Sequence, residues 1–405
     1  MRTGPLEGLR VVEWALDVPG SYCGKLLGDL GAEVIKIEAP EGDPVRRLGP
    51  FPNDVPGQER SALFLYLNNN KLGITLDLRS AGGKRVLKGL LSATDIFVVD
   101  CPVATLRDCG LEYTQLSGSN SQLIFTAITP FGLTGPYKDY KTTDLVSFHM
   151  SGFGHATPGN VEDPEKERPL RAGGRQADFA AGVTAAVASM HAVFARWKSG
   201  RGQLVDVSRL EAISAFNLGN VSTYSFSGQV PVRHKGGRRP GSVVALIPCA
   251  DGWVCLVAMM EYQWQAFLEA LGSPEWGSWE VFKDRYLRAE NWDVLEPLLH
   301  ELTRRFTKDE LAAACQAKRV PCLPVNSIAE MVGSPQFASR KFFVHVQHPV
   351  MGDVRVPRSP YVFSATPLSI RRPAPLLGEH TAQVLRERLG MGEQEIAKLQ
   401  EAGEI

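Results

Sequence analysis

The chain has 405 residues, with 44 Lys and Arg against 44 Asp and Glu, and seven cysteines. The resulting net charge of zero provides no overall field that would attract nucleic acid, which excludes it as a principal partner. Seven cysteines without a CxxC pair argue against a disulfide framework or a thiolate zinc site, and they predict a reducing, cytoplasmic location. A chain of this length can form two or three domains.

Apolar runs of strand length alternate with helical patterns through the first part of the chain. The predicted strands cover residues 9–14, 32–38, 73–78, 95–100 and 122–128, and the predicted helices cover 20–31 and 80–92. Such alternation is typical of an α/β fold with a mostly parallel sheet and helices on both of its faces.

The second half of the chain begins with a polar stretch rich in Gly and Pro over 138–174, which predicts an exposed excursion. An alanine-rich helix follows. Its apolar run over 179–195 contains His191, so a buried helix with a core histidine is predicted and no membrane span. A strand is predicted over 204–208. From about 225 to 335 the pattern, which includes an Asp-Gly hairpin turn, indicates a smaller α+β domain.

Asp178 stands at the start of the alanine-rich helix, where free N–H groups and the helix dipole favour an ionised carboxylate. This position alone predicts a helix N-cap. The same carboxylate, between Ala177 and Phe179 and after a glycine-rich run, would also suit a nucleophile that needs no general base. Both interpretations stay open on the residues alone.

Other candidate sites carry weaker signals. Four glycines between residues 20 and 31, with Glu38 after the second strand, suggest a dinucleotide site, but the G-x-G-x-x-G turn is missing. The loop from Arg233 to Arg239 clusters cations between glycines, which suits either a phosphate-holding cover or a solvated surface loop. The histidines lack metal-ligand spacing, so no metal site is predicted. The chain also lacks the P-loop motif of phosphoryl transfer and the GxSxG motif of a serine nucleophile.

Seven segments follow one another in a recognisable order from end to end. They are LEGLRVVEWA, GDLGAEVIKIEAPEGDPVR, LNNNKLGITLDL, TPFGLTGPY, ADFAAG, SGRGQLVDVS and PLLGEHT. Together they resemble the class III CoA-transferase family of the CaiB/BaiF type, which includes formyl-CoA and carnitine CoA-transferases and α-methylacyl-CoA racemases. The resemblance implies an acyl-CoA:carboxylate CoA-transferase that moves CoA between small organic acids. Asp178, at the family's catalytic aspartate, would form an aspartyl anhydride and then an aspartyl-CoA thioester.

The resemblance also implies an architecture and a set of binding residues. A discontinuous Rossmann-like large domain would cover 1–222 and 336–405, a small domain would cover 223–335, and two ring-like chains would interlock as a homodimer. The implied CoA contacts are Val18 (through its backbone), Arg46, Asn70, Lys71 and Lys138, and the implied substrate loop contains Gly236, Gly237, Arg238 and Arg239. The two arginines replace part of a glycine run in relatives, which suggests recognition of an anionic acyl group or a carboxylate acceptor. A CoA thioester is the implied substrate, with no permanently bound cofactor.

The chain departs from the family pattern at several positions. Racemase members carry a His where this chain has Thr143, which favours transfer over racemisation. Ala39 stands in place of a CoA-contacting Arg, and Asp100 and Cys101 stand in another CoA-contacting segment. Two alternatives therefore stay open: an acyl-CoA racemase or isomerase of the same fold, and a non-catalytic relative that binds CoA esters.

Overall fold

The computed structural model describes residues 4–235 and 243–405. The chain forms two compact units. Unit 1 comprises Met1–His155, Leu170–Pro231 and Ala338–Ile405, and unit 2 comprises Ala156–Pro169 and Val232–Phe337. Unit 2 thus includes residues 156–169, which the sequence-based division placed in the large domain, and it begins its main segment at 232 instead of 223. The predicted substrate loop, Gly236 to Arg239, lies outside the described residues.

Unit 1 is built on a six-stranded parallel sheet with the strand order β3-β2-β1-β4-β5-β7. The strands are β1 (Arg10–Trp14), β2 (Glu33–Glu38), β3 (Lys71–Thr75), β4 (Ile96–Val99), β5 (Ile124–Thr129) and β7 (Leu204–Ser208). In the register, Val12 lies opposite Ile35 on one side and Phe97 on the other. The α/β prediction is confirmed. The order reverses direction between β1 and β4, which makes this pair the topological switch point of the sheet.

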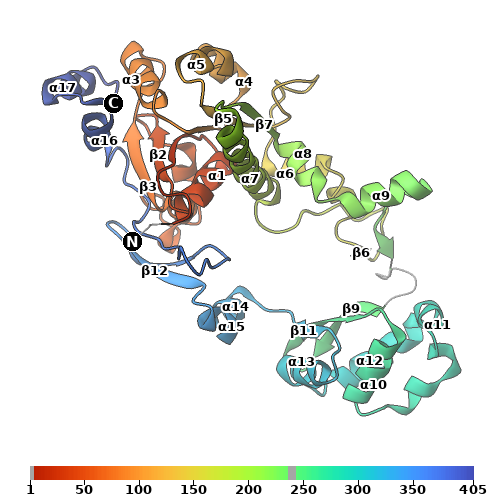
Figure 1. Cartoon of the computed structure of the whole chain (residues 1–405). Helices are drawn as coiled ribbons and strands as arrows, with labels where there is room; N and C mark the ends of the chain where they lie inside the picture. The colour runs from red at the N-terminus through yellow and green to blue at the C-terminus, as the bar shows by residue number, and fades with distance from the viewer. Residues whose placement is uncertain (1–3, 236–242) are drawn as a thin grey trace. The chain divides into compact units, whose positions relative to one another are not determined.

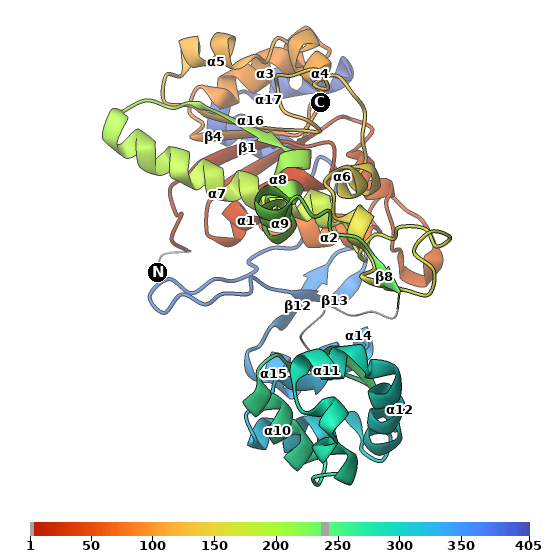
Figure 2. The same ribbon diagram turned by 90° about the vertical axis from the view of Figure 1, so that its right-hand side faces the viewer.

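Helices cover both faces of this sheet (Figure 1). One face carries α3 (Ala81–Leu91), α4 (Val103–Asp108), α5 (Tyr113–Ser119), α16 (Thr381–Leu389) and α17 (Glu393–Glu401), and the other carries α1 (Val18–Asp29) and α7 (Gln176–Ser199), with α2 (Ala62–Asn68) beside α1. Figure 2 shows α3, α4 and α5 above the sheet and α1 and α7 below it. Successive strand residues point to opposite faces of the sheet, and each face has its own apolar core. Val12 packs in the core on the α3 side, and Val11 packs in the core on the α7 side.

Helix α7 packs against α1, and Gly182 permits their close approach, because a Cβ at this position would lie 2.7 Å from the Pro19 carbonyl oxygen. Within the described chain, α7 is the one helix with the length and apolarity of a membrane span, and 56% of its apolar window is buried. His191 is exposed on this helix, so the prediction of a core histidine is wrong. The helical period places His191 on the solvent face with Val187 and Phe194, both of them exposed.

The remaining elements of unit 1 follow the sheet strands or return from unit 2. They are α6 (Asp144–Met150), α8 (Arg209–Ala215), α9 (Leu218–Ser227) and the antiparallel pair β12 (Phe343–His348) and β13 (Gly352–Pro357). The C-terminal segment is fixed to the edge strand β3, where the Thr75 N–H donates to Thr381 Oγ1 at 3.0 Å. Both ends of the described chain therefore belong to unit 1.

Unit 2 contains a three-stranded antiparallel sheet and its own apolar core. The strands are β9 (Val243–Cys249), β10 (Gly252–Ala258) and β11 (Cys322–Pro324), and the helices are α10 (Glu261–Ala270), α11 (Arg285–Glu290), α12 (Trp292–Thr303), α13 (Lys308–Ala317) and α14 (Ile328–Gly333), with α15 (Pro335–Ser339) at the boundary to unit 1. A short parallel pair joins β6 (Asn160–Val161) to β8 (His234–Lys235). Trp264 and Phe267 lie at the centre of the core. The predicted hairpin is confirmed, with its turn between Cys249 and Gly252.

Candidate active site

Asp178 lies at the carboxyl edge of the parallel sheet, beside its switch point. Asp17 follows β1 and Asp100 follows β4, the two strands that flank this point. Arg209, at the start of α8, pairs with both Asp17 and Asp178, at 2.7 and 3.2 Å. In open α/β sheets the crevice at a switch point is the usual place for a ligand. The fold thus places Asp178 where chemistry is expected.

The N-terminus of α7 is capped from another helix. Asp178 is the third residue of α7, and Arg175 stands at the N-cap position without a capping side-chain bond, so the N-cap interpretation of Asp178 is wrong. Asp144 on α6 provides the cap, because its Oδ1 accepts hydrogen bonds from the N–H groups of Ala177 and Asp178 at 2.9 and 3.2 Å. The Asp178 carboxylate is therefore left for other contacts.

Two arginines hold the Asp178 carboxylate. Arg175 Nη1 donates to Oδ2 at 2.8 Å, while Arg209 Nη1 lies 3.2 Å from Oδ1. The exposed fraction of the side chain is 0% for Asp178, 6% for Arg209 and 34% for Arg175. The carboxylate is thus enclosed, and of its two cationic partners Arg175 is the one that reaches solvent.

Burial raises the pKa of Asp178 to about 6, although the charge of Arg209 and the hydrogen bond from Arg175 act to lower this pKa. Asp17 and Asp144 are nearby carboxylates that raise it further. At neutral pH Asp178 is therefore ionised but more basic than an exposed aspartate. A buried, ionised and comparatively basic carboxylate is suited to nucleophilic attack.

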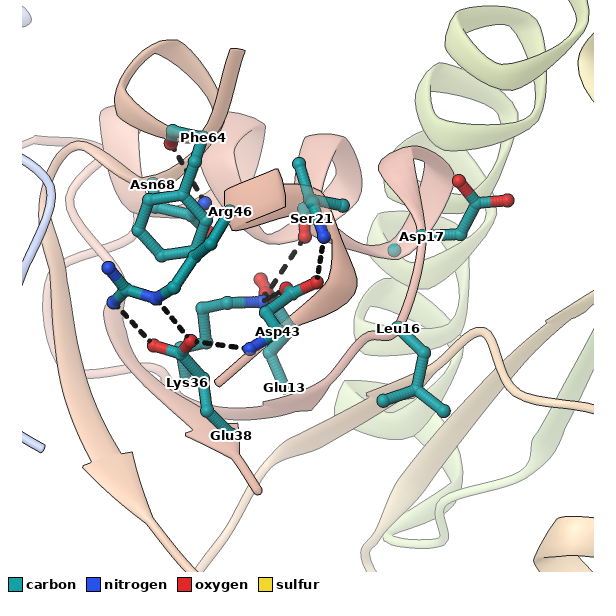
Figure 3. Close-up of polar contacts among 12 residues, drawn as sticks. Glu13, Leu16, Asp17, Ser21, Lys36, Glu38, Asp43, Arg46, Phe64 and Asn68 are labelled. Carbon is teal, nitrogen blue, oxygen red and sulfur yellow. Dashed lines mark hydrogen bonds and ion pairs between the residues drawn. The ribbon is translucent and has the colours of Figure 1, made fainter. Parts of the chain in front are cut away.

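A second cluster of charges is centred on Glu13 and Lys36 (Figure 3). Glu13 on β1 pairs with Lys36 Nζ at 3.1 Å and with Lys71 Nζ at 2.6 Å. Lys36 also pairs with Asp43 at 2.6 Å. Lys71 donates in addition to the Ser21 carbonyl oxygen and to Asn68 Oδ1, at 2.8 and 2.9 Å, which uses all three ammonium protons. The charges are paired, as buried ions require.

Arg46 and Lys71, both predicted to contact CoA, belong to this buried region. Arg46 pairs with Glu38 at 2.6 Å and with Glu59 at 2.5 Å, and its side chain is 1% exposed. Lys71 is completely buried. Because neither side chain offers any surface to a ligand, both hold α1 and the neighbouring loop on the sheet in this structure. Their contact with CoA stays a prediction.

A model of CoA-transferase family III matches residues 6–381 of the chain. The chain belongs to CoA-transferase family III. The sequence-based recognition of the family and of the enzyme class is confirmed, and CoA thioesters are the substrates that the family implies.

Relatives of this transferase match over nearly the whole chain. It is 36% identical over 389 residues to the succinyl-CoA:(R)-benzylsuccinate CoA-transferase subunit BbsE of Thauera aromatica, covering 93% of each chain. It is 33% identical over 389 residues to a succinate–glutarate CoA-transferase of Agrobacterium fabrum, covering 95% of this chain and 96% of that one. A crystal structure of a CaiB/BaiF family protein from Brucella suis is similar with a TM-score of 0.85 and 32% identity, over 95% of this chain and 100% of that one.

The other predicted contacts of the transferase lie at separate places. Val18 begins α1, and its N–H donates to Asp17 Oδ1 at 2.8 Å, close to the Asp178 cluster. Lys138 is partly exposed and pairs with Asp139. Asn70 lines a cleft of about 440 Å³ at the opposite, amino edge of the sheet, together with Arg371 and Arg372. The structure thus brings Val18 near Asp178 and places Asn70 at the other edge.

Asp100, one of the departures from the family pattern, has a structural role in the transferase. Its carboxylate accepts hydrogen bonds from the backbone N–H groups of Leu16, Asp17 and Gly20, at 2.5, 3.2 and 2.8 Å. These contacts fix the turn between β1 and α1, on which Asp17 stands. Burial raises the pKa of Asp100 well above its usual range. Asp100 thus stabilises the turn at the carboxyl edge of the sheet, beside Asp178.

Sequence reasoning missed four residues that contact Asp178 or its immediate partners: Asp17, Asp144, Arg175 and Arg209. Asp17 stands three residues after the predicted strand at 9–14, and Arg209 directly follows the one at 204–208, so the rule that sites lie at the carboxyl ends of parallel strands could have found them. Asp144 stands in the polar excursion and Arg175 directly after it, and neither carries such a signal. Over the residues that the structure describes, no group of three or more His, Cys, Asp or Glu could hold a metal ion.

Proposed function

We propose that this transferase moves CoA from succinyl-CoA to a small dicarboxylic acid, with Asp178 as the nucleophile. The relatives named above are a succinyl-CoA:(R)-benzylsuccinate and a succinate–glutarate CoA-transferase, so both names contain a C4 diacid and a second dicarboxylic acid. The observation that carries the proposal is the enclosed Asp178 carboxylate, held by Arg175 and Arg209 beside the switch point of the sheet.

The reaction proceeds by exchange of activated acyl groups. The Asp178 carboxylate attacks the donor thioester, which forms a mixed anhydride and releases CoA thiolate. The thiolate attacks the Asp178 carbonyl of the anhydride, which gives an aspartyl-CoA thioester and frees the donor acid. The acceptor carboxylate then attacks this thioester, and the released thiolate attacks the acceptor carbonyl of the new anhydride. Acceptor-CoA leaves, and Asp178 is again a carboxylate.

The protein contributes mainly position and charge to these steps. Arg209 is fixed between Asp17 and Asp178, so it orients the nucleophile before any substrate arrives. The arginines and the positive end of α7 lie where negative charge develops on the tetrahedral intermediates. No general base is required, because the attacking carboxylate is already ionised.

A screen of carboxylic acids tests the proposed activity. The protein is incubated with succinyl-CoA and a panel of mono- and dicarboxylic acids, and new CoA esters are identified by mass spectrometry. We expect the CoA ester of one or more dicarboxylic acids. Deuterium incorporation at the α-carbon in heavy water without transfer would favour the racemase alternative, and tight CoA-ester binding with neither reaction would favour a non-catalytic protein.

The raised pKa of Asp178 predicts an acid limb in the pH profile. Because the ionised form attacks, kcat/KM with succinyl-CoA is expected to be constant above about pH 7 and to fall as pH decreases through about 6, approaching tenfold per unit. The profile is measured from pH 4.5 to 8, with circular dichroism at each pH to verify folding. A profile that stays flat down to about pH 5, as for an ordinary aspartate, would contradict this environment for the nucleophile.

We also propose that the transferase is a homodimer. Large apolar side chains are exposed on α9 and on the C-terminal part of α7: Phe194, Trp197, Leu218, Val221, Tyr224 and Phe226, the last of these 93% exposed. Large exposed apolar side chains on a helix are typical of protein–protein interfaces. Sedimentation equilibrium should give twice the 44.3 kDa of one chain. Introducing two charges through Trp197→Glu and Phe226→Glu should weaken the assembly, and a wild-type protein that stays monomeric at micromolar concentration would refute it.

A further inference from the structure

We propose that Arg175 is the residue that recognises the second carboxylate of a dicarboxylic substrate, and that it leaves Asp178 when this carboxylate binds. The inference rests on the proposed function, because it takes Asp178 as the nucleophile. Beyond that function, it assigns to Arg175 the selection of dicarboxylic over monocarboxylic acids.

The first argument is access to the nucleophile. Arg175 Nη1 lies 2.8 Å from Asp178 Oδ2 and 3.8 Å from Asp17 Oδ1. Asp178 has no exposed surface of its own, whereas Arg175 is 34% exposed. Arg175 thus stands between Oδ2 and solvent, and a thioester carbonyl cannot reach this oxygen while the guanidinium occupies it. Attack through Oδ2 requires Arg175 to move.

The second argument is that the neighbouring cations are held more firmly or lie elsewhere. Arg209 is 6% exposed and fixed by Asp17 and Asp178, so it cannot turn towards a substrate. Arg171 is 45% exposed, but its Nη1 pairs with Asp144 at 3.1 Å and has no direct contact with Asp178. Arg175 combines solvent exposure with direct contact to the nucleophile.

The local chain permits this movement. The N-terminus of α7 does not depend on Arg175, because the Asp144 carboxylate caps it. Arg175 can therefore change its partner without unravelling the helix that carries Asp178.

The chemistry of the exchange favours dicarboxylic acids. A guanidinium forms short, often bidentate hydrogen bonds with a carboxylate, so the second carboxylate of the substrate can replace Asp178 as the partner of Arg175. The exchange keeps Arg175 paired and frees Asp178 Oδ2 from a hydrogen bond that stabilises its charge. At the acceptor step Asp178 is an uncharged thioester, so the second carboxylate of a dicarboxylic acceptor gives Arg175 an anionic partner, and a monocarboxylic acceptor leaves this partly buried arginine with a weaker one.

The test compares two acceptors of equal chain length. With succinyl-CoA as donor, kcat/KM is measured for glutarate and for valerate, which has five carbons but lacks the second carboxylate. In a double-displacement reaction this quantity reports on the acceptor step alone. We expect Arg175→Gln to lower the glutarate-to-valerate ratio at least about tenfold. Arg171→Gln, the control at a similarly exposed arginine, should leave the ratio within about twofold. Arg175→Lys keeps the charge without the planar fork and should give an intermediate ratio.

A second readout separates recognition from a merely structural effect. Removing Arg175 removes a hydrogen bond that lowers the Asp178 pKa, so the acid limb of kcat/KM for succinyl-CoA should move to higher pH in Arg175→Gln. An unchanged acceptor ratio, or an equal loss for both acceptors, would overturn the role of Arg175. If the wild-type protein transfers CoA to no acid, the proposed function itself fails, which is a distinct result.

Discussion

Asp178→Asn is expected to lower kcat for CoA transfer at least about 1,000-fold while the protein stays folded. The amide has nearly the same shape as the carboxylate but cannot attack a thioester. Since Arg209 also pairs with Asp17 at 2.7 Å, it keeps one carboxylate partner in the variant. Initial rates with succinyl-CoA and glutarate measure the effect, and thermal unfolding shows whether the fold is retained.

Trapping gives direct evidence for the same residue. Hydroxylamine added during turnover should convert the aspartyl thioester to a hydroxamate, which peptide mass spectrometry locates at Asp178 in the wild-type protein. Asp206→Asn serves as the control, because Asp206 is an exposed acid on β7 that accepts a hydrogen bond from the Leu133 N–H. This control should keep nearly full activity. A fully active Asp178→Asn protein would exclude the nucleophilic role.

Glu13→Gln is expected to destabilise unit 1 by about 3–5 kcal/mol. Glu13 is the shared carboxylate partner of Lys36 and Lys71, and all three side chains are completely buried. The glutamine keeps the shape but leaves Lys71 without an anionic partner and Lys36 with Asp43 alone. Removing one member of a buried ion pair costs far more than the pair itself contributes, because the remaining charge cannot be solvated.

The thermal midpoint measures this loss, which for a unit of this size corresponds to a decrease of about 5–10 °C. Asp77→Asn is the comparison, because it breaks the surface pair with Arg79, whose side chain is 76% exposed. An exposed, solvent-screened pair contributes little to stability, so this variant should unfold near the wild-type temperature. Equal midpoints for the two variants would show that the buried network contributes little.

The sheet was predictable because its pattern is local. Apolar runs and helical patterns alternate along the chain, and the predicted strands coincide with observed ones within one or two residues. The strand predicted at 73–78 instead covers Lys71–Thr75. Leu76 and Leu78 are buried although they follow the strand, so the apolar pattern continues beyond Thr75 and the predicted strand ended too late. Lys71 resembled a loop residue, although it is a buried strand residue whose charge is paired with Glu13. Charged residues inside apolar strands, such as Glu13 and Lys36, were the available signal for that network.

The site was predictable only in part, because its contacts come from distant segments. Asp178 was identified through a family motif, but Asp17, Asp144 and Arg209 reach it from the loop after β1, from α6 and from α8. No local rule indicates that Asp144 would cap α7 and release Asp178 from that task. Helix propensity alone therefore favoured the N-cap interpretation, which a tertiary contact overrides.

The complete enclosure of Asp178 has a consequence for the fate of its intermediates. An aspartyl anhydride and an aspartyl thioester are both susceptible to hydrolysis, which would waste the activated acyl group and turn a transferase into a thioesterase. The Asp178 side chain is 0% exposed, and when Arg175 leaves it the bound acyl group and CoA occupy the place of the guanidinium, so bulk water has little direct approach to the aspartyl carbonyl. For an enzyme that works through such intermediates, burial of the nucleophile thus favours delivery of CoA to an acid over its loss to solvent.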